Sequence, residues 1–351
     1  MEPRSLGFVA TACAGNQSGG SPETLVRRVC TDSRQTQQGD LFFALTGGRF
    51  DGHDFLAEVA KKGASAVVAE RKRLPAGWSD CPVIAVEDTR AALGRLAAQY
   101  RQGFSLPLVV VGGANGKTTT KELVAAVLRQ KYATLWNEAS FNNDIGVPLT
   151  LLRLENSHQA GVLEAGTNHP GELAPLVKMI QPRSGVITSI GREHLEFFGD
   201  LAGVAREEGT LAELLPAAGK LYVNGDDEWA SHLAERASAE VVRAGFGERN
   251  NWRARGLRPD KRGVRFLVDG PNPDLAGEYR IHLFGRHQVV NALFAIAIGA
   301  ELGLNHAELA QGLAECRPPK MRLEMWESGG VYVLDDAYNA NADSMAMALQ
   351  T

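Results

Sequence analysis

The sequence predicts an α/β fold with a doubly wound, mostly parallel central sheet, and three observations support this prediction. Over residues 108–223, short apolar runs alternate with helical segments, as in parallel sheets joined by crossover helices. The run 109–111 is apolar and β-branched, and it breaks into glycines and then a Lys-Thr pair where a helix begins. Residues 241–284 contain three short runs separated by turn residues, which is typical of antiparallel hairpins.

The first part of the chain, residues 1–104, is predicted to form a small N-terminal α/β domain. Its expected helices are 6–13, 55–62 and 89–101, and its expected strands are 41–45, 66–69 and 83–86. The apolar run at 6–13 is short for a signal peptide and follows the acidic Glu2, so we expect an amphipathic helix there. Residues 103–107 are the expected junction with the next domain.

The central domain is predicted over residues 105–316. Its expected parallel strands are 108–111, 161–163, 185–190 and 220–223, with helices at 117–130, 171–180 and 201–215. The expected antiparallel segment has strands at 253–257, 263–268 and 279–283, followed by a long helix at 287–302. Pro318-Pro319 marks the next boundary, and a strand at 331–334 begins a third α/β domain over residues 317–351.

The loop after the first central strand has the pattern of a phosphate-binding P-loop, Gly113-x-x-Gly116-Lys117-Thr118. Glycines let backbone N–H groups turn toward an anion, and the helix N-terminus adds positive potential. Lys117 can reach terminal phosphates, and the Thr118 hydroxyl can ligate a magnesium ion. Val111 stands where the usual P-loop has a glycine, which argues against ordinary GTPases and small-molecule kinases. The sequence therefore predicts binding of a nucleoside triphosphate.

Composition disfavours several other classes of function. The 351 residues, 44% hydrophobic and 22% charged, are typical of a soluble globular chain of two to three domains. The net charge of −4, with basic residues scattered among acids, argues against nucleic-acid or membrane binding. Asn291 and Glu301 interrupt the apolar run 289–304, which predicts a packed helix and no membrane insertion. The four cysteines are far apart and predict neither a zinc site nor disulfides, as expected in a reducing cytoplasm: Cys13, Cys30, Cys81 and Cys316.

Two polar side chains are predicted at the carboxyl ends of central strands, where ligands bind in open parallel sheets. Glu164 ends one strand, and His194 follows another. With the Thr118 hydroxyl, they would suit divalent metals that bridge nucleotide phosphates. A strand-end glutamate is often only a helix cap, and a lone histidine is more often structural, so both alternatives stay open.

Over nearly its whole length, the chain resembles the Mur ligases, ATP-dependent amino-acid and peptide ligases of bacterial cell-wall synthesis. The resemblance is closest to the member that adds D-Ala-D-Ala to UDP-MurNAc-tripeptide. The blocks around Asn142-Asn143-Asp144 and Tyr338-Asn339 are fairly specific to that member. The matching blocks are 31–34, 39–45, 50–53, 113–118, 142–148, 164–168, 194–196, 285–287 with Asn291, and 335–341.

The resemblance implies a two-step amide ligation with ATP and Mg²⁺. ATP phosphorylates the carboxylate of UDP-MurNAc-tripeptide, and the amine of D-Ala-D-Ala attacks the acyl phosphate. Lys117 would be catalytic, with magnesium held by Thr118, Glu164 and His194. Asn291 would contact the adenine of the nucleotide, and Arg322 and Asp336 would reach the nucleotide from the third domain upon closure. The P-loop residues that would bind the nucleotide are Gly113, Ala114, Asn115, Gly116, Lys117, Thr118 and Thr119.

The resemblance also implies binding sites for the UDP-linked substrate. Ser33, Arg34 and the loop Asp51-Gly52-His53 would hold the UDP end, while Asn142 and Asn143 would lie near the sugar and peptide. The alternative for Asp51-Gly52 is an ordinary turn, because this pair is also a good turn sequence.

Many Mur ligases have a carbamoylated lysine one helix beyond the histidine, and Glu208 stands at that position here. We hypothesise that Glu208 replaces the modified lysine as a catalytic metal ligand. The alternative is that Glu207 and Glu208 form a solvated helix face.

The resemblance leads us to expect a cytoplasmic, monomeric enzyme. A family member would carry a third domain of roughly 100 to 150 residues, so the 351 residues are expected to be C-terminally truncated and their turnover is left open. Two alternative functions remain: a non-catalytic module that binds nucleotide and UDP-sugar, and another Mur or folylpolyglutamate-type ligase.

Overall fold

The computed structural model describes residues 1–48, 50–138, 141–317 and 320–351. The chain divides into two compact units, one of Met1–Ser105 with Asp144–Ser157 and one of Leu106–Asn143 with His158–Thr351. The first cut lies close to the junction predicted at 103–107. The sequence did not indicate that Asp144–Ser157 belongs to the smaller unit, and the boundary predicted at Pro318-Pro319 lies outside the described residues.

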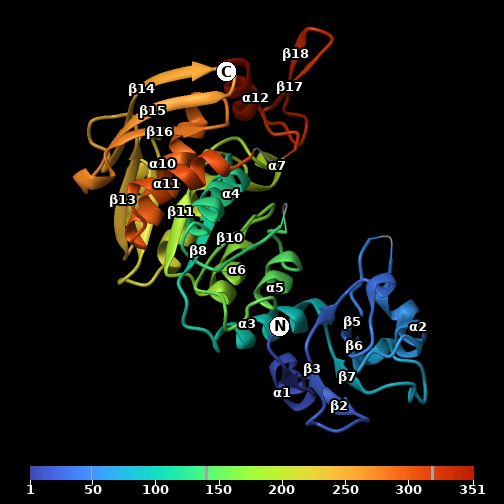
Figure 1. Ribbon diagram of the computed structural model, residues 1–351. Helices are drawn as coiled ribbons and strands as arrows, with labels where there is room; N and C mark the ends of the chain where they lie inside the picture. Colours follow the sequence, from blue (N-terminus) through green and yellow to red (C-terminus); the bar gives the residue numbers. More distant parts are fainter. Residues whose placement is uncertain (49, 139–140, 318–319) are drawn as a thin grey trace. The chain divides into compact units, whose positions relative to one another are not determined.

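The smaller unit is built on a five-stranded sheet in the order β2-β7-β6-β5-β4 (Figure 1). The strands β4 to β7 are parallel, and β2 is antiparallel to β7. These strands are β2 (Asn16–Ser18), β4 (Val29–Cys30), β5 (Leu41–Phe43), β6 (Ala66–Glu70) and β7 (Val83–Val86). A separate short pair joins β1 (Arg4–Ser5) to β3 (Leu25–Val26).

The helices of the smaller unit include all three that the sequence predicted. They are α1 (Leu6–Cys13), α2 (Leu56–Lys61), α3 (Thr89–Arg101) and α5 (Gly146–Leu151), with short 3₁₀ turns η1 (Ser33–Gln35), η2 (Gly52–Phe55) and η3 (Arg71–Arg73). Helix α3 begins after Asp88, whose side chain accepts the N–H of Ala91 and so caps the first turn. It packs against both α1 and α5, and the buried hydroxyl of Tyr100 donates to the carbonyl of Leu154, 2.6 Å away. This contact ties the segment Asp144–Ser157 to the smaller unit.

The larger unit is built on one nine-stranded sheet in the order β16-β15-β14-β13-β12-β11-β8-β10-β9. Strands β8 to β14 pair in parallel, and β15 and β16 add an antiparallel edge. The strands are β8 (Leu108–Gly112), β9 (Thr134–Trp136), β10 (Ala160–Glu164), β11 (Ser184–Ile187), β12 (Lys220–Asn224), β13 (Glu240–Gly245), β14 (Trp252–Asp260), β15 (Gly263–Asp269) and β16 (Gly277–Ile281). The predicted α/β fold with a mostly parallel sheet and an antiparallel extension is confirmed.

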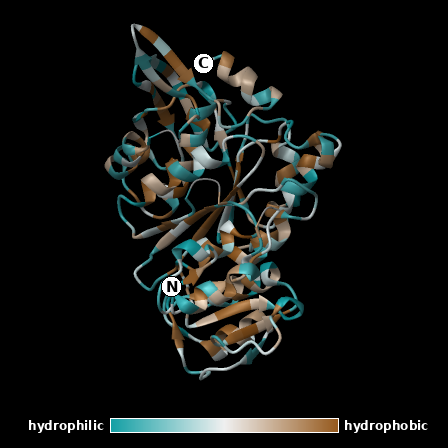
Figure 2. Ribbon diagram, turned by 90° about the vertical axis from the view of Figure 1, so that its right-hand side faces the viewer, coloured by the Kyte–Doolittle hydropathy of each residue, from teal (hydrophilic) through white to brown (hydrophobic). Residues whose placement is uncertain are grey.

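Helices cover both faces of this sheet, as a doubly wound fold requires. Helix α4 packs against α10 and α11 over one face (Figure 1). Helix α6 packs against α8 over the other. The strands between these layers are largely apolar (Figure 2). The helices are α4 (Lys117–Leu128), α6 (Leu173–Ile180), α7 (Leu195–Phe198), α8 (Leu201–Leu214), α9 (Ala230–Arg236), α10 (Arg286–Glu301) and α11 (His306–Glu315), with a 3₁₀ turn η4 (Pro273–Leu275).

The last described segment, residues 320–351, contains a hairpin and a helix. Strands β17 (Glu324–Ser328) and β18 (Val331–Asp335) pair antiparallel, and α12 (Ala342–Leu349) follows. The side chain of Asn341 accepts the N–H of Ser344, and the Ser344 hydroxyl accepts the N–H of Asn341, which closes a capping box. Within residues 1–48, 50–138, 141–317 and 320–351, none of the helices combines the length and apolar character needed to cross a bilayer.

Candidate functional site

The site is centred on the loop that joins β8 to α4. Strand β8 is buried between β10 and β11. The loop begins where β8 ends, at the carboxyl edge of the parallel strands. Gly113 and Gly116 then adopt φ values of +108° and +89°. A Cβ at Gly113 would lie 2.5 Å from the hydroxyl of Thr188 on the neighbouring strand connection. Glycine is therefore required there both by the backbone conformation and by the space.

The first turn of α4 presents backbone N–H groups to the site. The first helical bond runs from the N–H of Thr120 to the carbonyl of Gly116, so the N–H groups of 117–119 have no partner within the helix. By contrast, Ala114 and Asn115 donate their N–H groups to the carbonyl and hydroxyl of Ser189. The N–H groups at 117–119 are thus available to an anion, while the N–H groups at 114 and 115 hold the loop in shape.

A cavity of about 310 Å³ opens beside this loop, and all its lining residues belong to the larger unit. The P-loop, Glu164, His194, Asn142, Arg322 and Asp336 of the predicted site all contribute to its wall. The wall is formed by residues 114–119, Asn142, Glu164, Asn168, Glu193, His194, His287, Gln288, Arg322, Leu323, Asp336, Tyr338, Asn339, Asn341, Ser344 and Met347.

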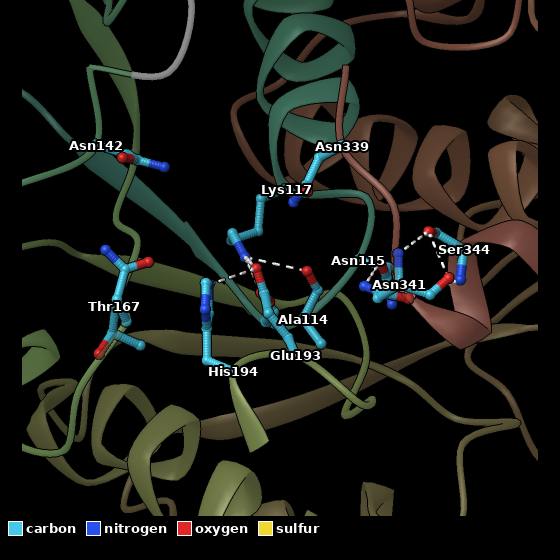
Figure 3. A network of polar contacts seen from close by, with 12 residues as sticks. Ala114, Asn115, Lys117, Asn142, Thr167, Glu193, His194, Asn339, Asn341 and Ser344 are labelled. Atoms are coloured by element: carbon cyan, nitrogen blue, oxygen red, sulfur yellow. Dashed lines mark hydrogen bonds and ion pairs between the residues drawn. The ribbon is translucent and has the colours of Figure 1, made fainter. Parts of the chain in front are cut away.

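Lys117 is buried and fully engaged in the loop. Its Nζ donates to the carbonyls of Gly113 and Ala114 at 2.6 and 3.0 Å, and to Glu193 at 2.9 Å (Figure 3). Burial lowers the pKa of Lys117, but the charges of Glu193, Glu208 and Glu164 outweigh it, so the pKa is raised. The lysine therefore remains an ammonium.

Glu164 is held at the end of β10 with one carboxylate oxygen uncommitted. Its Oε1 accepts the Asn142 side-chain N–H at 2.8 Å, and its backbone N–H is taken by the side chain of Asn137. Its Oε2 is buried and has no hydrogen-bond partner. A buried carboxylate oxygen without a donor is costly, and a cation would satisfy it.

His194 follows β11 and begins the short helix α7. It has a left-handed φ of +50°, a conformation that is strained for a residue with a side chain. Its Nε2 lies 3.6 Å from Oε1 of Glu193, beside the P-loop lysine. The sequence expectation that Glu164 and His194 lie at the same cavity as Thr118 agrees with this geometry.

The residues at the cavity fit a magnesium ion that is completed by phosphate oxygens. Among the residues that the structure describes, no three His, Cys, Asp or Glu side chains form a metal cluster on their own. Mg²⁺ in nucleotide sites is typically held by one or two carboxylates, a hydroxyl and the phosphates themselves. Thr118, the free oxygen of Glu164 and His194 could provide such ligands, and their metal role stays a prediction.

Glu208 lies behind the P-loop and is not part of the cavity wall. It is 2% exposed on α8, and its Oε2 accepts the N–H of Gly113 at 2.6 Å. Burial raises the pKa of Glu208 to about 7, although the charge of Lys117 opposes the shift. Glu208 is thus not on a solvated helix face. Its role as a metal ligand stays a prediction.

Glu207, the neighbour of Glu208, is also buried and caps the start of α6. Its carboxylate accepts the N–H groups of Gly171 and Leu173 and the hydroxyl of Thr167. These contacts hold the loop after Glu164, which brings Asn168 to the cavity. The solvated face that the sequence suggested for 207–208 does not exist.

Asn291, predicted at the adenine, lies under the P-loop. A Cβ at Gly116 would lie 3.0 Å from its Oδ1, and its Nδ2 donates to Gln288 at 2.9 Å. Asn291 does not contribute to the cavity wall, whereas Gln288 does. A contact with adenine stays a prediction.

The segment 320–351 reaches the P-loop. Asn341 donates to the Asn115 side chain at 2.9 Å (Figure 3). The N–H of Arg192 donates to Asp343 at 2.7 Å. The guanidinium of Arg322 stacks on Tyr338, 4.1 Å from the ring centre. Asp336 accepts the N–H of Leu323, and burial raises the pKa of Asp336. Arg322 and Asp336 line the same cavity as the P-loop. Their contact with a nucleotide stays a prediction.

The predicted UDP residues belong to the smaller unit. Arg34 pairs with Asp32 through two hydrogen bonds of 2.9 and 2.7 Å, which lowers the pKa of Asp32 to about 2. Ser33 is buried, and its carbonyl accepts from Lys62. These contacts are internal to the unit, and UDP binding stays a prediction.

Asp51 caps the start of the turn η2 and contacts the side chains of His53 and Arg73. It accepts both the backbone N–H and the Nδ1–H of His53, and it pairs with Arg73. Gly52 approaches the backbone of Ala44 so closely that a Cβ would lie 2.8 Å from it. Asp51-Gly52 therefore forms a turn, as the alternative interpretation expected. A contact of this pair with UDP stays a prediction. Asn143, in the larger unit, does not line the cavity.

Several polar residues of the cavity wall were not predicted as site residues, among them Glu193, Asn341 and Ser344. Glu193 directly precedes His194, but its ion pair with Lys117 spans 76 positions, so no local pattern announced it. Asn341 and Ser344 cap α12 at the cavity wall. An Asn followed by Ser three residues later is a capping signal that could have located this helix start.

Comparison with known proteins points to one family. Residues 111–299 match the model described as Mur ligase middle domain, and residues 25–101 match Mur ligase family, catalytic domain. The chain is 34% identical over 329 residues to a UDP-N-acetylmuramoyl-tripeptide--D-alanyl-D-alanine ligase of Bacillus subtilis (strain 168), covering 93% of this chain and 70% of that protein. Identity to the protein of the same name from Escherichia coli (strain K12) is 37% over 325 residues, with 92% and 71% covered. A crystal structure of MurF from Acinetobacter baumannii matches with a TM-score of 0.92 at 33% identity, covering 100% of this chain and 76% of that chain.

Proposed function

The chain belongs to the Mur ligase family, and from this premise we propose that it adds D-Ala-D-Ala to UDP-MurNAc-tripeptide with ATP. The observation that carries the proposal is the cavity in which the P-loop lysine, the free oxygen of Glu164 and the Arg322–Asp336 segment meet. The chain is 34% and 37% identical to two proteins named UDP-N-acetylmuramoyl-tripeptide--D-alanyl-D-alanine ligase, across more than nine-tenths of its length. This identity supports the choice of substrates.

The reaction joins a carboxylate to an amine in two steps. The tripeptide carboxylate attacks the γ-phosphorus of ATP, which releases ADP and leaves an acyl phosphate. The amine of D-Ala-D-Ala then attacks the acyl carbon, phosphate leaves, and the nitrogen loses a proton to give the amide. Activation is needed because an oxide ion cannot leave a carboxylate.

The chain's own residues position and neutralise the transferring phosphate. The N–H groups at 117–119 and the ammonium of Lys117 bind phosphate oxygens at the start of α4. Thr118, Glu164 and His194 would hold Mg²⁺, which supplies positive charge against the developing negative charge. Arg322 and Asp336 close the cavity from the segment 320–351.

We propose three domains for this work, at 1–104, 105–316 and 317–351. Two observations support the first two domains. The smaller compact unit has a boundary after Ser105, and the family models match residues 25–101 and 111–299. The UDP end of the substrate is assigned to Ser33, Arg34 and the Asp51 turn in the first domain, and Asn142 and Asn143 to its sugar and peptide.

The test is release of ADP from Mg-ATP in the presence of UDP-MurNAc-tripeptide, with and without D-Ala-D-Ala. ADP release that requires the dipeptide would support the proposal. The product should then be heavier than UDP-MurNAc-tripeptide by the mass of D-Ala-D-Ala minus one water in mass spectrometry. Lys117→Met should abolish it, and Lys178→Met on the exposed face of α6 should not. Nucleotide binding without ADP release would favour a binding module, and release that follows glutamate instead of D-Ala-D-Ala would favour another ligase.

A further inference from the structure

Glu193 is the ion-pair partner of Lys117, the lysine of the P-loop. The two carboxylate oxygens lie 3.1 and 2.9 Å from Nζ, and the carbonyls of Gly113 and Ala114 take the other donors of the ammonium (Figure 3). An ammonium has three N–H donors. All of its donors are therefore satisfied within the protein, and a nucleotide can bind Lys117 only by replacing a partner.

Of these partners, only Glu193 can leave without dismantling the loop. The carbonyls of Gly113 and Ala114 belong to the P-loop backbone, whereas Glu193 is a side chain on the connection between β11 and α7. Its side chain is 17% exposed and lines the cavity, so there is room for it to move.

Glu193 also has a second neighbour, His194. Its Oε1 lies 3.6 Å from Nε2 of His194, which is a predicted metal ligand. A carboxylate that leaves the ammonium would therefore remain next to the position of a divalent cation, and carboxylates are favourable Mg²⁺ ligands.

We propose that Glu193 is a carboxylate switch that makes nucleotide binding depend on a divalent cation. Without nucleotide, Glu193 neutralises Lys117. When a cation and nucleotide bind together, phosphate oxygens take the ammonium and Glu193 turns to the cation beside His194. The inference rests on the proposed nucleotide-binding function of this site and adds a specificity-determining residue to it.

The charges around the cavity explain why the switch selects metal-bound nucleotide. The carboxylates of Glu193, Glu208 and Glu164 all act on Lys117. A metal-free triphosphate would displace Glu193 and then face three carboxylates, with only Lys117 and Arg322 of the cavity wall as permanently cationic side chains. With a cation present, the displaced carboxylate gains a partner, and the repulsion is offset.

The experiment is equilibrium binding of ATP to the chain, measured in Mg²⁺ and in EDTA, for the wild type, Glu193→Gln and Glu193→Ala. Both variants remove the competing charge, so we expect their affinity in EDTA to rise at least about tenfold, the factor for one charge-assisted hydrogen bond. The ratio of the dissociation constants in EDTA and Mg²⁺ should fall by a similar factor. Glu228→Gln, on an exposed residue after β12, is the control and should keep the wild-type ratio.

Three results would overturn the inference. A ratio within twofold of the wild type in both variants would mean that Glu193 does not compete with phosphate. Weaker binding by the same factor in both buffers would mean that Glu193 only holds Lys117 in place. Failure of the folded wild type to bind Mg-ATP at all would refute the proposed function itself, and the switch with it, which distinguishes the two.

Discussion

Replacing Glu164 by glutamine tests whether its free oxygen is a cation ligand. In the wild type, Oε2 is buried without a donor, whereas Oε1 is held by Asn142. An unsatisfied buried polar atom costs about 1–3 kcal/mol. Glutamine keeps an oxygen for Asn142 and removes the charge, although its amide N–H groups are then buried instead. Without cation, we therefore expect Glu164→Gln to be as stable as the wild type, or up to about 2 kcal/mol more stable.

The expected loss appears when Mg-ATP is added. A ligand at one hundred times its dissociation constant stabilises the folded state by about 2.7 kcal/mol. In a unit of about 230 residues, each kcal/mol raises Tm by ~2–4 °C, so the wild type should gain roughly 5–11 °C. If losing this ligand weakens binding about a hundredfold, the same ligand concentration stabilises the variant by only ~0.4 kcal/mol, or about 1 °C.

The assay is thermal unfolding of both proteins with EDTA, with Mg²⁺, and with Mg-ATP. Glu235→Gln, an exposed position on α9, should shift like the wild type. A wild-type Tm shift in Glu164→Gln would refute the ligand role. A variant that is more than 2 kcal/mol less stable in EDTA would instead assign Glu164 a structural role.

Three further predictions concern the loop and the smaller unit. Gly113→Ala should weaken Mg-ATP binding by more than about tenfold in titration, because its Cβ would lie 2.5 Å from Thr188 Oγ1 at a φ of +108°. Tyr100→Phe should lower the free energy of unfolding in urea by about 1–3 kcal/mol, since the carbonyl of Leu154 loses its buried donor. Burial lowers the pKa of His53 from 6.5, so the unfolded chain binds its proton more tightly; stability should fall as pH drops below about 6.5, and His53→Gln should flatten this slope in Tm measurements.

Each of these has a matched control. Gly171→Ala also has a positive φ but no atom within 4 Å of the new Cβ, so ATP affinity should persist. Tyr332→Phe removes an exposed hydroxyl and should change the unfolding free energy little. His232→Gln, at an exposed position, should leave the pH slope unchanged. Equal effects in a variant and its control would contradict the corresponding prediction.

Much of the fold could be predicted because its elements have local signatures. Helix α3 was predicted with its observed bounds, 89–101, from hydrophobic periodicity. The predicted strand at 185–190 ends earlier, at Ile187, since strand ends depend on how far the neighbouring strands pair. Segment 144–157 was not recognised as part of the smaller unit because its helix, α5, packs on α3 far back in the sequence.

The same division holds at the site. The glycines and Lys117 of the P-loop could be recognised because the conformation and chemistry they supply are local. Glu193 was not predicted, since it meets the loop across 76 positions. Glu208 was predicted only from the resemblance, as a metal ligand, and its contact with Gly113 across 95 positions was not. Strand order brings Glu193 to Lys117, because β11 lies directly beside β8 although other strands separate them in the chain.

The sequence by itself therefore determined the α/β periodicity, the phosphate-binding loop and the strand-end positions of Glu164 and His194. Only the tertiary structure decided which charges share the cavity, which oxygen of Glu164 is left without a donor, and that Glu208 supports the loop from behind. The physical reason is that dihedral preferences and hydrophobic periodicity act over a few residues. Burial and electrostatics depend on which distant segments the sheet brings together.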